Sequence, residues 1–165
     1  MKTLEHIDGD IFKVRGIQVI GHQSNCQNVM RSGIANTIRT MFPEAYEADC
    51  QATKEGVNKL GNISFTEVRQ RDYTDIQFIF NLYGQNLGTD YNKLYDRKTD
   101  YEALFTALQK MNNLCARTAD NLTVAFPWKM GADRAKGDWR IVERLIEVAF
   151  DNYTGRVMIV HYVNG

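Results

Sequence analysis

The sequence predicts an α/β fold, in which helices cover both faces of a sheet. Short apolar runs rich in β-branched residues alternate along the chain with longer amphipathic segments, and strands separated by helices form such covered sheets. A length of 165 residues with 44% hydrophobic residues fills one core but is short for two. Two prolines, no repeat and no low-complexity segment leave no linker, so we expect a single domain over residues 1–165.

The strands are expected where apolar residues run together: residues 16–22, 62–68, 76–83, 122–126 and 156–163. A helix is predicted after the first run, because apolar residues recur at helical spacing from Ile34 to Phe42 and Ser32 can cap them. Pro43 is expected to open a second short helix, since proline suits a first helical turn.

Two later helices have their own start signals. The capping-box pattern "TDYE" (Thr99–Glu102) precedes an apolar stripe that runs from Tyr101 to Cys115. Asp138 can cap a helix whose buried stripe lies between Val142 and Ala149. Pro127 ends the strand 122–126, and the junction 127–139 leads from it into the last helix.

The charge balance excludes several classes of partner. Twenty basic and 20 acidic residues give no overall field that would attract nucleic acid or an anionic membrane.

No run approaches the roughly 18 apolar residues that span a bilayer, and the start "MKTLEHIDGD" lacks the apolar core of a signal peptide. Three cysteines without metal-ligand spacing (Cys26, Cys50, Cys115) fit reduced thiols. We expect a cytoplasmic monomer that needs no metal or cofactor.

Two strand-to-helix junctions, residues 22–35 and 127–139, carry the candidate chemistry. Ligands of covered sheets bind beyond the carboxyl ends of the strands, on such junctions. The second junction, "PWKMGADRAKGDW", combines glycines with a new helix N-terminus, which favours phosphate binding. Four basic residues fall in the two loops: Arg31, Lys129, Arg134 and Lys136. The alternative is that the glycines are plain turns and the basic side chains are solvated.

Other ligand classes are poorly supported. The chain has neither GxxxxGK[ST] nor GxGxxG, which argues against nucleotide hydrolysis and dinucleotide redox chemistry. Cys26 and His22 could form a nucleophile pair, but packing is the more ordinary role for two residues so close along one strand.

The motifs together resemble the macrodomain family. "GDIFKV", "GHQSNCQNVMRSGIANTIRTMFPEAY", "FIFNLYGQ", "TDYEALFTALQKM" and "FPWKMGADRAKGDWRIVERLIEVAF" follow one another in the order seen in macrodomains, over nearly the whole chain. The sequence is most similar to small stand-alone members, the ADP-ribose 1″-phosphate phosphatases and the related terminal ADP-ribose glycohydrolases. This resemblance implies a three-layer α/β/α sandwich with a mixed six-stranded sheet, and a cleft for ADP-ribose across its crest.

The resemblance also assigns residues to the ligand. Asp10 matches the aspartate that accepts a hydrogen bond from the adenine amino group, with Ile11 beside it, although a turn residue is the alternative. Asn25 matches the polar residue facing the distal ribose, and Tyr162 is the candidate to pack on adenine unless it fills the core. The two phosphate loops match Met30, Arg31, Ser32, Gly33, Ile34 and Ala35, and then Pro127, Lys129, Met130, Gly131, Ala132, Asp133 and Arg134, the second loop running to Lys136.

The chain departs from the family pattern at several positions. Arg31 and Asp133 stand where macrodomains usually have glycine, which restricts the approach of backbone to phosphate. Arg31 could compensate with a charge-assisted bond or partly close the cleft. Gln85 replaces the lysine nucleophile of the glycohydrolase branch, and an amide cannot form a Schiff base. Ala135 replaces the aspartate of that branch's second loop.

The phosphatase branch fits better. Its histidine is present as His22, which we expect at the carboxyl end of its strand, where it can transfer a proton near neutral pH. Asn25 and loop amides would hold the phosphate, and Gln85 could orient water. Asp133 and Asp138 are the candidates for the second catalytic group. A buried, purely structural His22 is the alternative.

We therefore expect a macrodomain that binds ADP-ribose and hydrolyses the phosphate of ADP-ribose 1″-phosphate. Two alternatives remain: a hydrolase that removes ADP-ribose from protein or nucleic acid without a lysine, and a non-catalytic reader of ADP-ribose signals.

Overall fold

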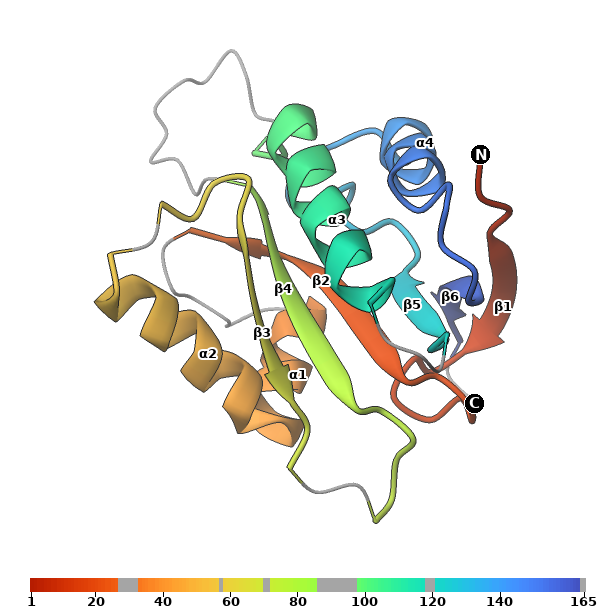
Figure 1. Cartoon of the computed structure of the whole chain (residues 1–165), viewed down its shortest axis with the longest axis horizontal. Coiled ribbons are helices and arrows are strands. Elements are labelled where there is room, and N and C mark those ends of the chain that lie inside the picture. Colours follow the sequence, from red (N-terminus) through yellow and green to blue (C-terminus); the bar gives the residue numbers. More distant parts are fainter. Residues whose placement is uncertain (27–32, 57, 70–71, 86–97, 118–120, 164–165) are drawn as a thin grey trace.

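A computed structural model describes residues 1–26, 33–56, 58–69, 72–85, 98–117 and 121–163. In chain order its elements are β1 (Glu5–Gly9), β2 (Val19–Asn25), α1 (Gly33–Met41), α2 (Pro43–Lys54), β3 (Ile63–Glu67), β4 (Phe78–Gln85), α3 (Tyr101–Cys115), β5 (Val124–Pro127), α4 (Trp139–Ala149) and β6 (Val157–Tyr162) (Figure 1).

The six strands form one mixed sheet in the order β1-β6-β5-β2-β4-β3. Strands β1, β6, β5, β2 and β4 are parallel to one another, whereas β3 pairs with β4 in the antiparallel direction. The predicted sandwich with a mixed six-stranded sheet is therefore confirmed. Because five strands run in the same direction, their carboxyl ends meet at one edge of the sheet, where a ligand site is expected.

Helices cover both faces of the sheet (Figure 1). Side chains of α3 and α4 pack against one face, around Phe126 and Leu82. Side chains of α1 and α2 pack against the other face, around Ile20 and Ile79. Alternate residues of the central strands serve the two cores, which explains why these strands read as continuous apolar runs.

Several predicted boundaries need correction. β2 continues to Asn25, three residues past the expected end at His22. The cap of α3 is Asp100, whose side chain accepts from Ala103 N at 2.9 Å, so the expected capping box beginning at Thr99 is wrong. Asp138 caps α4 as predicted, and Pro43 opens α2. The apolar patterns do not indicate β1, because it is a half-exposed edge strand of mostly polar residues.

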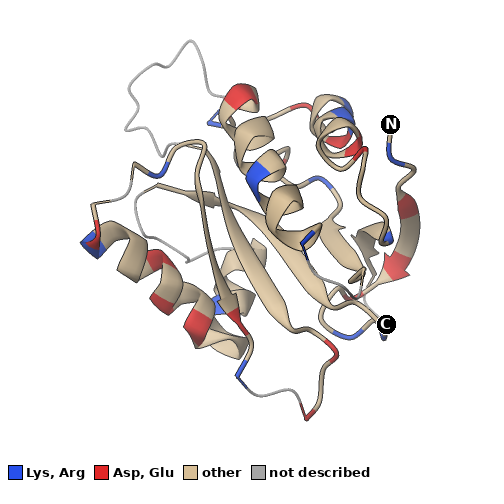
Figure 2. Ribbon diagram, in the orientation of Figure 1, with Lys and Arg blue, Asp and Glu red and all other residues tan. Residues whose placement is uncertain are grey.

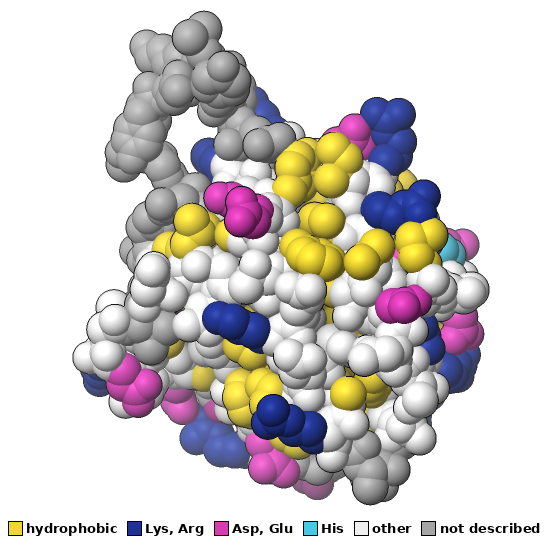
Figure 3. Space-filling model, turned by 45° about the horizontal axis from the view of Figure 1, so that its top comes forward, with side chains coloured by type: hydrophobic (Ala, Val, Ile, Leu, Met, Phe, Trp, Pro, Cys, Tyr) yellow, Lys and Arg dark blue, Asp and Glu magenta, His cyan; other side chains and the backbone are white. Residues whose placement is uncertain are grey.

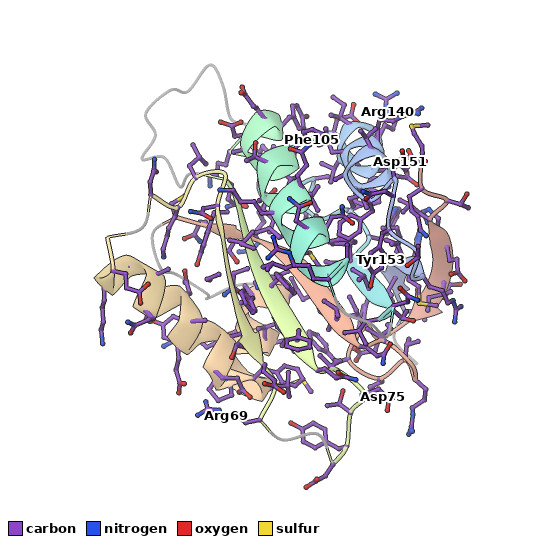
Figure 4. The ribbon with its side chains drawn as sticks, in the orientation of Figure 1. Arg69, Asp75, Phe105, Arg140, Asp151 and Tyr153 are labelled. Carbon is purple, nitrogen blue, oxygen red and sulfur yellow. The ribbon has the colours of Figure 1, made fainter. Side chains whose placement is uncertain are left out.

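The surface carries charges of both signs. Basic and acidic residues are interspersed over the ribbon in Figure 2 and over the face shown in Figure 3. At the amino end of β4, opposite the crest, Asp75 (Figure 4) accepts from Gly16 N at 2.8 Å and from Arg15 Nε at 3.1 Å. No helix in the described part of the chain is long and apolar enough to cross a membrane.

Candidate functional site

A cleft of about 860 Å³ lies along the carboxyl ends of the five parallel strands. Each strand contributes to it where it ends: β1 with Gly9, β6 with Tyr162, β5 with Pro127, β2 with Asn25 and β4 with Gln85. The first turn of α1 and the loop after β5 form its walls. The predicted site residues that line it are Asp10, Ile11, Asn25, Gly33, Ile34, Ala35, Gln85, Pro127, Lys129, Met130, Gly131, Asp133, Arg134 and Tyr162.

Other predicted ligand or catalytic residues are not among the lining. Met30, Arg31 and Ser32 lie outside the described residues. Ala132 belongs to the second loop but does not line the cleft, and neither does His22, the expected proton donor. Conversely, Gln23 and Lys98 line the cleft although the sequence patterns do not single them out, and Trp128 lines it from within the predicted second loop.

Asp10 holds the turn at the β1 end of the cleft. Its Oδ1 accepts from Phe12 N at 2.9 Å, and its carbonyl oxygen accepts from Lys13 N and Val14 N. No described residue bonds to its other carboxylate oxygen, Oδ2. Asp10 is therefore a turn residue and a cleft residue at once, with a carboxylate oriented by its own backbone.

The loop from Pro127 to Gly137 is a closely folded wall. Three of its residues have positive φ: Lys129 at 63°, Gly131 at 73° and Lys136 at 58°. For the two lysines this is a strained conformation, of a kind found most often at functional sites. Gly137 N donates to Gly131 O at 2.8 Å, and a Cβ at Gly137 would lie 2.5 Å from that oxygen. Glycine at 137 thus permits a close backbone approach, which makes the wall compact.

The segment before α3 holds the loop 127–137 in place by hydrogen bonds. Lys98 N and Thr99 N both donate to Ala135 O, at 2.9 and 3.2 Å. The Thr99 hydroxyl donates to Gly131 O at 2.6 Å. Thr99 is 2% exposed, so these bonds are shielded from water. The wall of the cleft is consequently held by the residues that lead into α3 as well as by β5.

A row of amides forms the floor of the cleft. Gln23 Nε2 donates to Gln85 Oε1 at 2.7 Å and to Thr99 Oγ1 at 2.9 Å. Gln23 Oε1 is buried and finds no partner among the described residues. Leaving such an acceptor unpaired costs about 1–3 kcal/mol, so the arrangement is not explained by stability alone.

His22 does not reach the cleft, and its predicted position at the strand end is wrong. It lies inside β2, is 0% exposed, and donates from Nε2 to Asn81 Oδ1 at 2.7 Å, while Asn81 Nδ2 donates to Ala45 O. Nδ1 is buried without a described partner. Burial lowers the pKa of His22 to about 4, because the protein interior disfavours the charged imidazolium. The structure therefore supports the alternative, a buried structural histidine.

Cys26 is also unsuited to act as a nucleophile. Its Sγ donates to the carbonyl oxygen of Gln85 at 3.4 Å, and burial raises the pKa of the thiol. A raised pKa keeps the thiol protonated, and the thiolate is the reactive form. The hypothesis of a Cys26–His22 pair is thus not supported.

An ion pair is buried beneath α2, away from the cleft. Lys59 Nζ lies 2.7 Å from Asp49 Oδ1, and both side chains are at most 5% exposed. Tyr83 Oη donates to the same carboxylate oxygen at 2.6 Å. Burial, followed by this carboxylate, raises the pKa of Tyr83 above its usual range. These groups tie α2 to β4, so we assign them a structural role.

Aromatic side chains flank the cleft at the β5 and β6 ends. Trp128 stacks on His161 with ring centroids 4.4 Å apart, and Lys129 Nζ lies 4.4 Å from the Trp128 ring centroid. The Trp128 ring is therefore already engaged within the chain. Tyr162 is 70% exposed and lines the cleft, so its ring does not fill the core.

Comparison with known proteins gives a consistent result. The sequence profile of the Macro domain family matches residues 22–146. The macrodomain of Mycobacterium tuberculosis DarG is 19% identical over 99% of this chain and 100% of its own, with a TM-score of 0.78. A protein of unknown function from Bacteroides thetaiotaomicron is 21% identical over 97% of this chain and 98% of its own, with a TM-score of 0.80. No curated protein matches.

One of the similar solved structures is a complex. Thermosipho africanus DarTG in complex with ADP-ribose is 16% identical over 96% of this chain, which spans 42% of that protein, with a TM-score of 0.76. At these identities the similarity establishes the fold.

Proposed function

Because this chain belongs to the Macro domain family, we propose that its crest cleft binds ADP-ribose or a derivative of it. The observation that carries the proposal is one continuous cleft, joining the Asp10 carboxylate at one end to the amides of Asn25 and Gln85 at the other. A structurally similar protein, the DarTG of Thermosipho africanus, has been solved with ADP-ribose.

The adenine would lie at the β1 end. Oδ2 of Asp10 can accept a hydrogen bond from the exocyclic amino group, the only strong donor on the adenine edge. Ile11 and Phe12 supply apolar contact beside it, and Tyr162 offers an exposed ring for stacking. The Asp10 turn fixes the carboxylate before the ligand arrives, which reduces the entropy lost on binding.

The diphosphate would lie between the start of α1 and the loop 127–137. Backbone N–H groups in the first turn of a helix have no intrahelical partner and favour anions. Gly33 has a φ of 59°, and an added Cβ there would meet no atom of the described, non-neighbouring residues within 4 Å, so those residues leave the backbone open at this point. Lys129 and Arg134, which line the cleft, add local positive charge to a chain that is neutral overall.

The distal ribose would then reach Asn25 and Gln85. A hydrolytic reaction at this ribose needs a group that takes a proton from water, and His22 is buried elsewhere. Asp133 is the carboxylate that lines the cleft on the second loop, since Asp138 is occupied as the cap of α4. The position of Asp133 in the cleft lining supports a second candidate function, the hydrolysis of ADP-ribose 1″-phosphate. In this function the Asp133 carboxylate takes a proton from the attacking water.

The decisive experiment compares binding with turnover. Isothermal titration calorimetry of the whole chain with ADP-ribose tests the binding proposal, and ADP-ribose binding no tighter than that of ribose 5-phosphate would contradict it. Phosphate release from ADP-ribose 1″-phosphate and ADP-ribose release from modified protein, measured side by side, test the two hydrolytic alternatives. Binding without either release would identify a reader. Phosphate release that persists unchanged in Asp133→Asn would exclude Asp133 as the base.

A further inference from the structure

Each hydrogen bond on the cleft floor has a donor and an acceptor that can be assigned, starting from the Thr99 hydroxyl. Thr99 Oγ1 lies 2.6 Å from the carbonyl oxygen of Gly131. A carbonyl oxygen carries no hydrogen, so the single hydroxyl proton of Thr99 occupies this bond. The Thr99 oxygen is consequently left to accept a bond from its other neighbour, Gln23.

This acceptor decides how the two amides are oriented. The Gln23 atom 2.9 Å from Thr99 Oγ1 must carry a hydrogen, and is therefore Nε2. The same Nε2 lies 2.7 Å from the Gln85 side chain, whose nearest atom must accept and is therefore Oε1. The opposite orientation of either amide would bring two donors or two acceptors into contact.

Gln85 therefore directs its own Nε2 away from Gln23. The Gln85 side chain lines the cleft, and no described residue accepts a hydrogen bond from Nε2. Lys98, which also lines the cleft and precedes Thr99 in the chain, adds a second donor. The glycines keep the row intact, because a Cβ at Gly84 or Gly131 would lie 2.8 Å from Gln23 Oε1.

We propose that Thr99 and Gln23 are positioning residues that hold Gln85 with an N–H donor toward the distal ribose. The subsite then selects ligands that carry an acceptor oxygen at this place, such as a ribose hydroxyl or a phosphate attached to the ribose. The inference rests on the proposed function, because it requires the distal ribose to lie beside Gln85. ADP shares adenosine and diphosphate with ADP-ribose but has no distal ribose, so it does not use this subsite.

The test is the ratio of the dissociation constants of ADP and ADP-ribose, measured by calorimetry on the whole chain. Gln85→Met removes the donor without adding charge, and should weaken ADP-ribose binding by about tenfold while ADP binding changes less than about twofold. Thr99→Val removes the hydroxyl with little change of shape, and should lower the ratio by about threefold to tenfold. Thr99→Ser keeps the hydroxyl and should restore the ratio, which a merely structural role for the Thr99 methyl group would not do.

Each outcome decides the inference. An unchanged ratio in Gln85→Met, or in a folded Thr99→Val, overturns it, and if Thr99→Val does not fold then Gln85→Met decides alone. A wild-type protein that binds ADP and ADP-ribose equally also overturns the inference but leaves the proposed function intact. A wild-type protein that binds neither ligand contradicts the proposed function itself.

Discussion

An alanine at position 131 tests how closely the second loop fits the cleft floor. Gly131 has a φ of 73°, in the left-handed region that favours glycine. A Cβ at this position would lie 2.8 Å from Gln23 Oε1 and 3.2 Å from Thr99 Oγ1. Gly131→Ala therefore adds two costs: backbone strain, and displacement of the Gln23 amide from its hydrogen bonds.

Gly16 supplies the matched control, because a substitution there has the first cost alone. Its φ is 88°, and no atom of the described residues, apart from its two chain neighbours, lies within 4 Å of an added Cβ. We expect Gly16→Ala to lower the free energy of unfolding by about 1–2 kcal/mol, the cost of a left-handed residue with a side chain. Gly131→Ala should cost about 1–2 kcal/mol more, the worth of the one or two bonds that Gln23 loses. For a chain of this length, the extra loss lowers Tm by roughly 2–8 °C.

The measurement is urea unfolding of the two alanine variants, of Gln23→Ala, and of the double variant Gly131→Ala/Gln23→Ala. Truncating Gln23 removes its clash but leaves the 3.2 Å contact with Thr99 Oγ1, so Gly131→Ala should cost less in the Gln23→Ala protein than in the wild type. If Gly131→Ala destabilises the otherwise unchanged protein no more than Gly16→Ala, the fit between loop and floor is looser than we infer.

Three further predictions concern single side chains. Asp10→Asn keeps an acceptor for Phe12 N but turns a donor toward adenine, so ADP-ribose affinity should fall about tenfold or more with Tm nearly unchanged; unchanged affinity in calorimetry would remove Asp10 from the adenine site. The pKa of His22 is lowered to about 4 from 6.5, so the unfolded chain binds a proton that the folded chain does not between these values. The contribution of His22 to the free energy of unfolding is therefore constant above about pH 6.5. As the pH falls toward 4, the free energy of unfolding should drop by about 2–3 kcal/mol, and urea unfolding of His22→Asn should lack this part of the pH dependence. Lys59→Met leaves the Asp49 carboxylate buried without its cation and should cost about 3–5 kcal/mol, most of which Lys59→Met/Asp49→Leu should recover; equal losses in the single and double variants would argue against a buried charge as the cause.

The sheet and its helices could be predicted because apolar patterning is local. The apolar run at 76–83 and the apolar stripe of α3 can each be recognised over a few residues. Pro43 and Asp138 mark helix starts because proline suits a first helical turn and aspartate can cap a helix. β1 has no such apolar pattern, and it forms a strand because it pairs with β6. The approximate location of the site follows from the same patterns, because strand-to-helix junctions lie at the carboxyl ends of parallel strands.

The contacts inside the site are less accessible to sequence reasoning. Gln23 bonds to residues 62 and 76 positions away, a separation at which no local pattern operates. Thr99 imitates a helix cap because Thr-x-x-Glu matches the capping box, whereas the neighbouring Asp100 takes that role. The prediction for His22 is wrong because three more residues of strand bury it, and the end of a strand is the feature that patterns locate least well.

The pairing of the first strand with the last has a consequence for how the molecule is assembled. β1 pairs with β6, and Glu5 binds Arg156 across a separation of 151 residues, so this edge of the sheet closes a loop that spans most of the chain. Contacts of such high sequence separation form slowly, and in a growing chain β1 has no partner until β6 has been synthesised. Asp10 directly follows β1. The β1 end of the cleft, where we propose that adenine binds, is thus completed last, and a chain interrupted before β6 would retain most of its core residues and lack this end of the cleft.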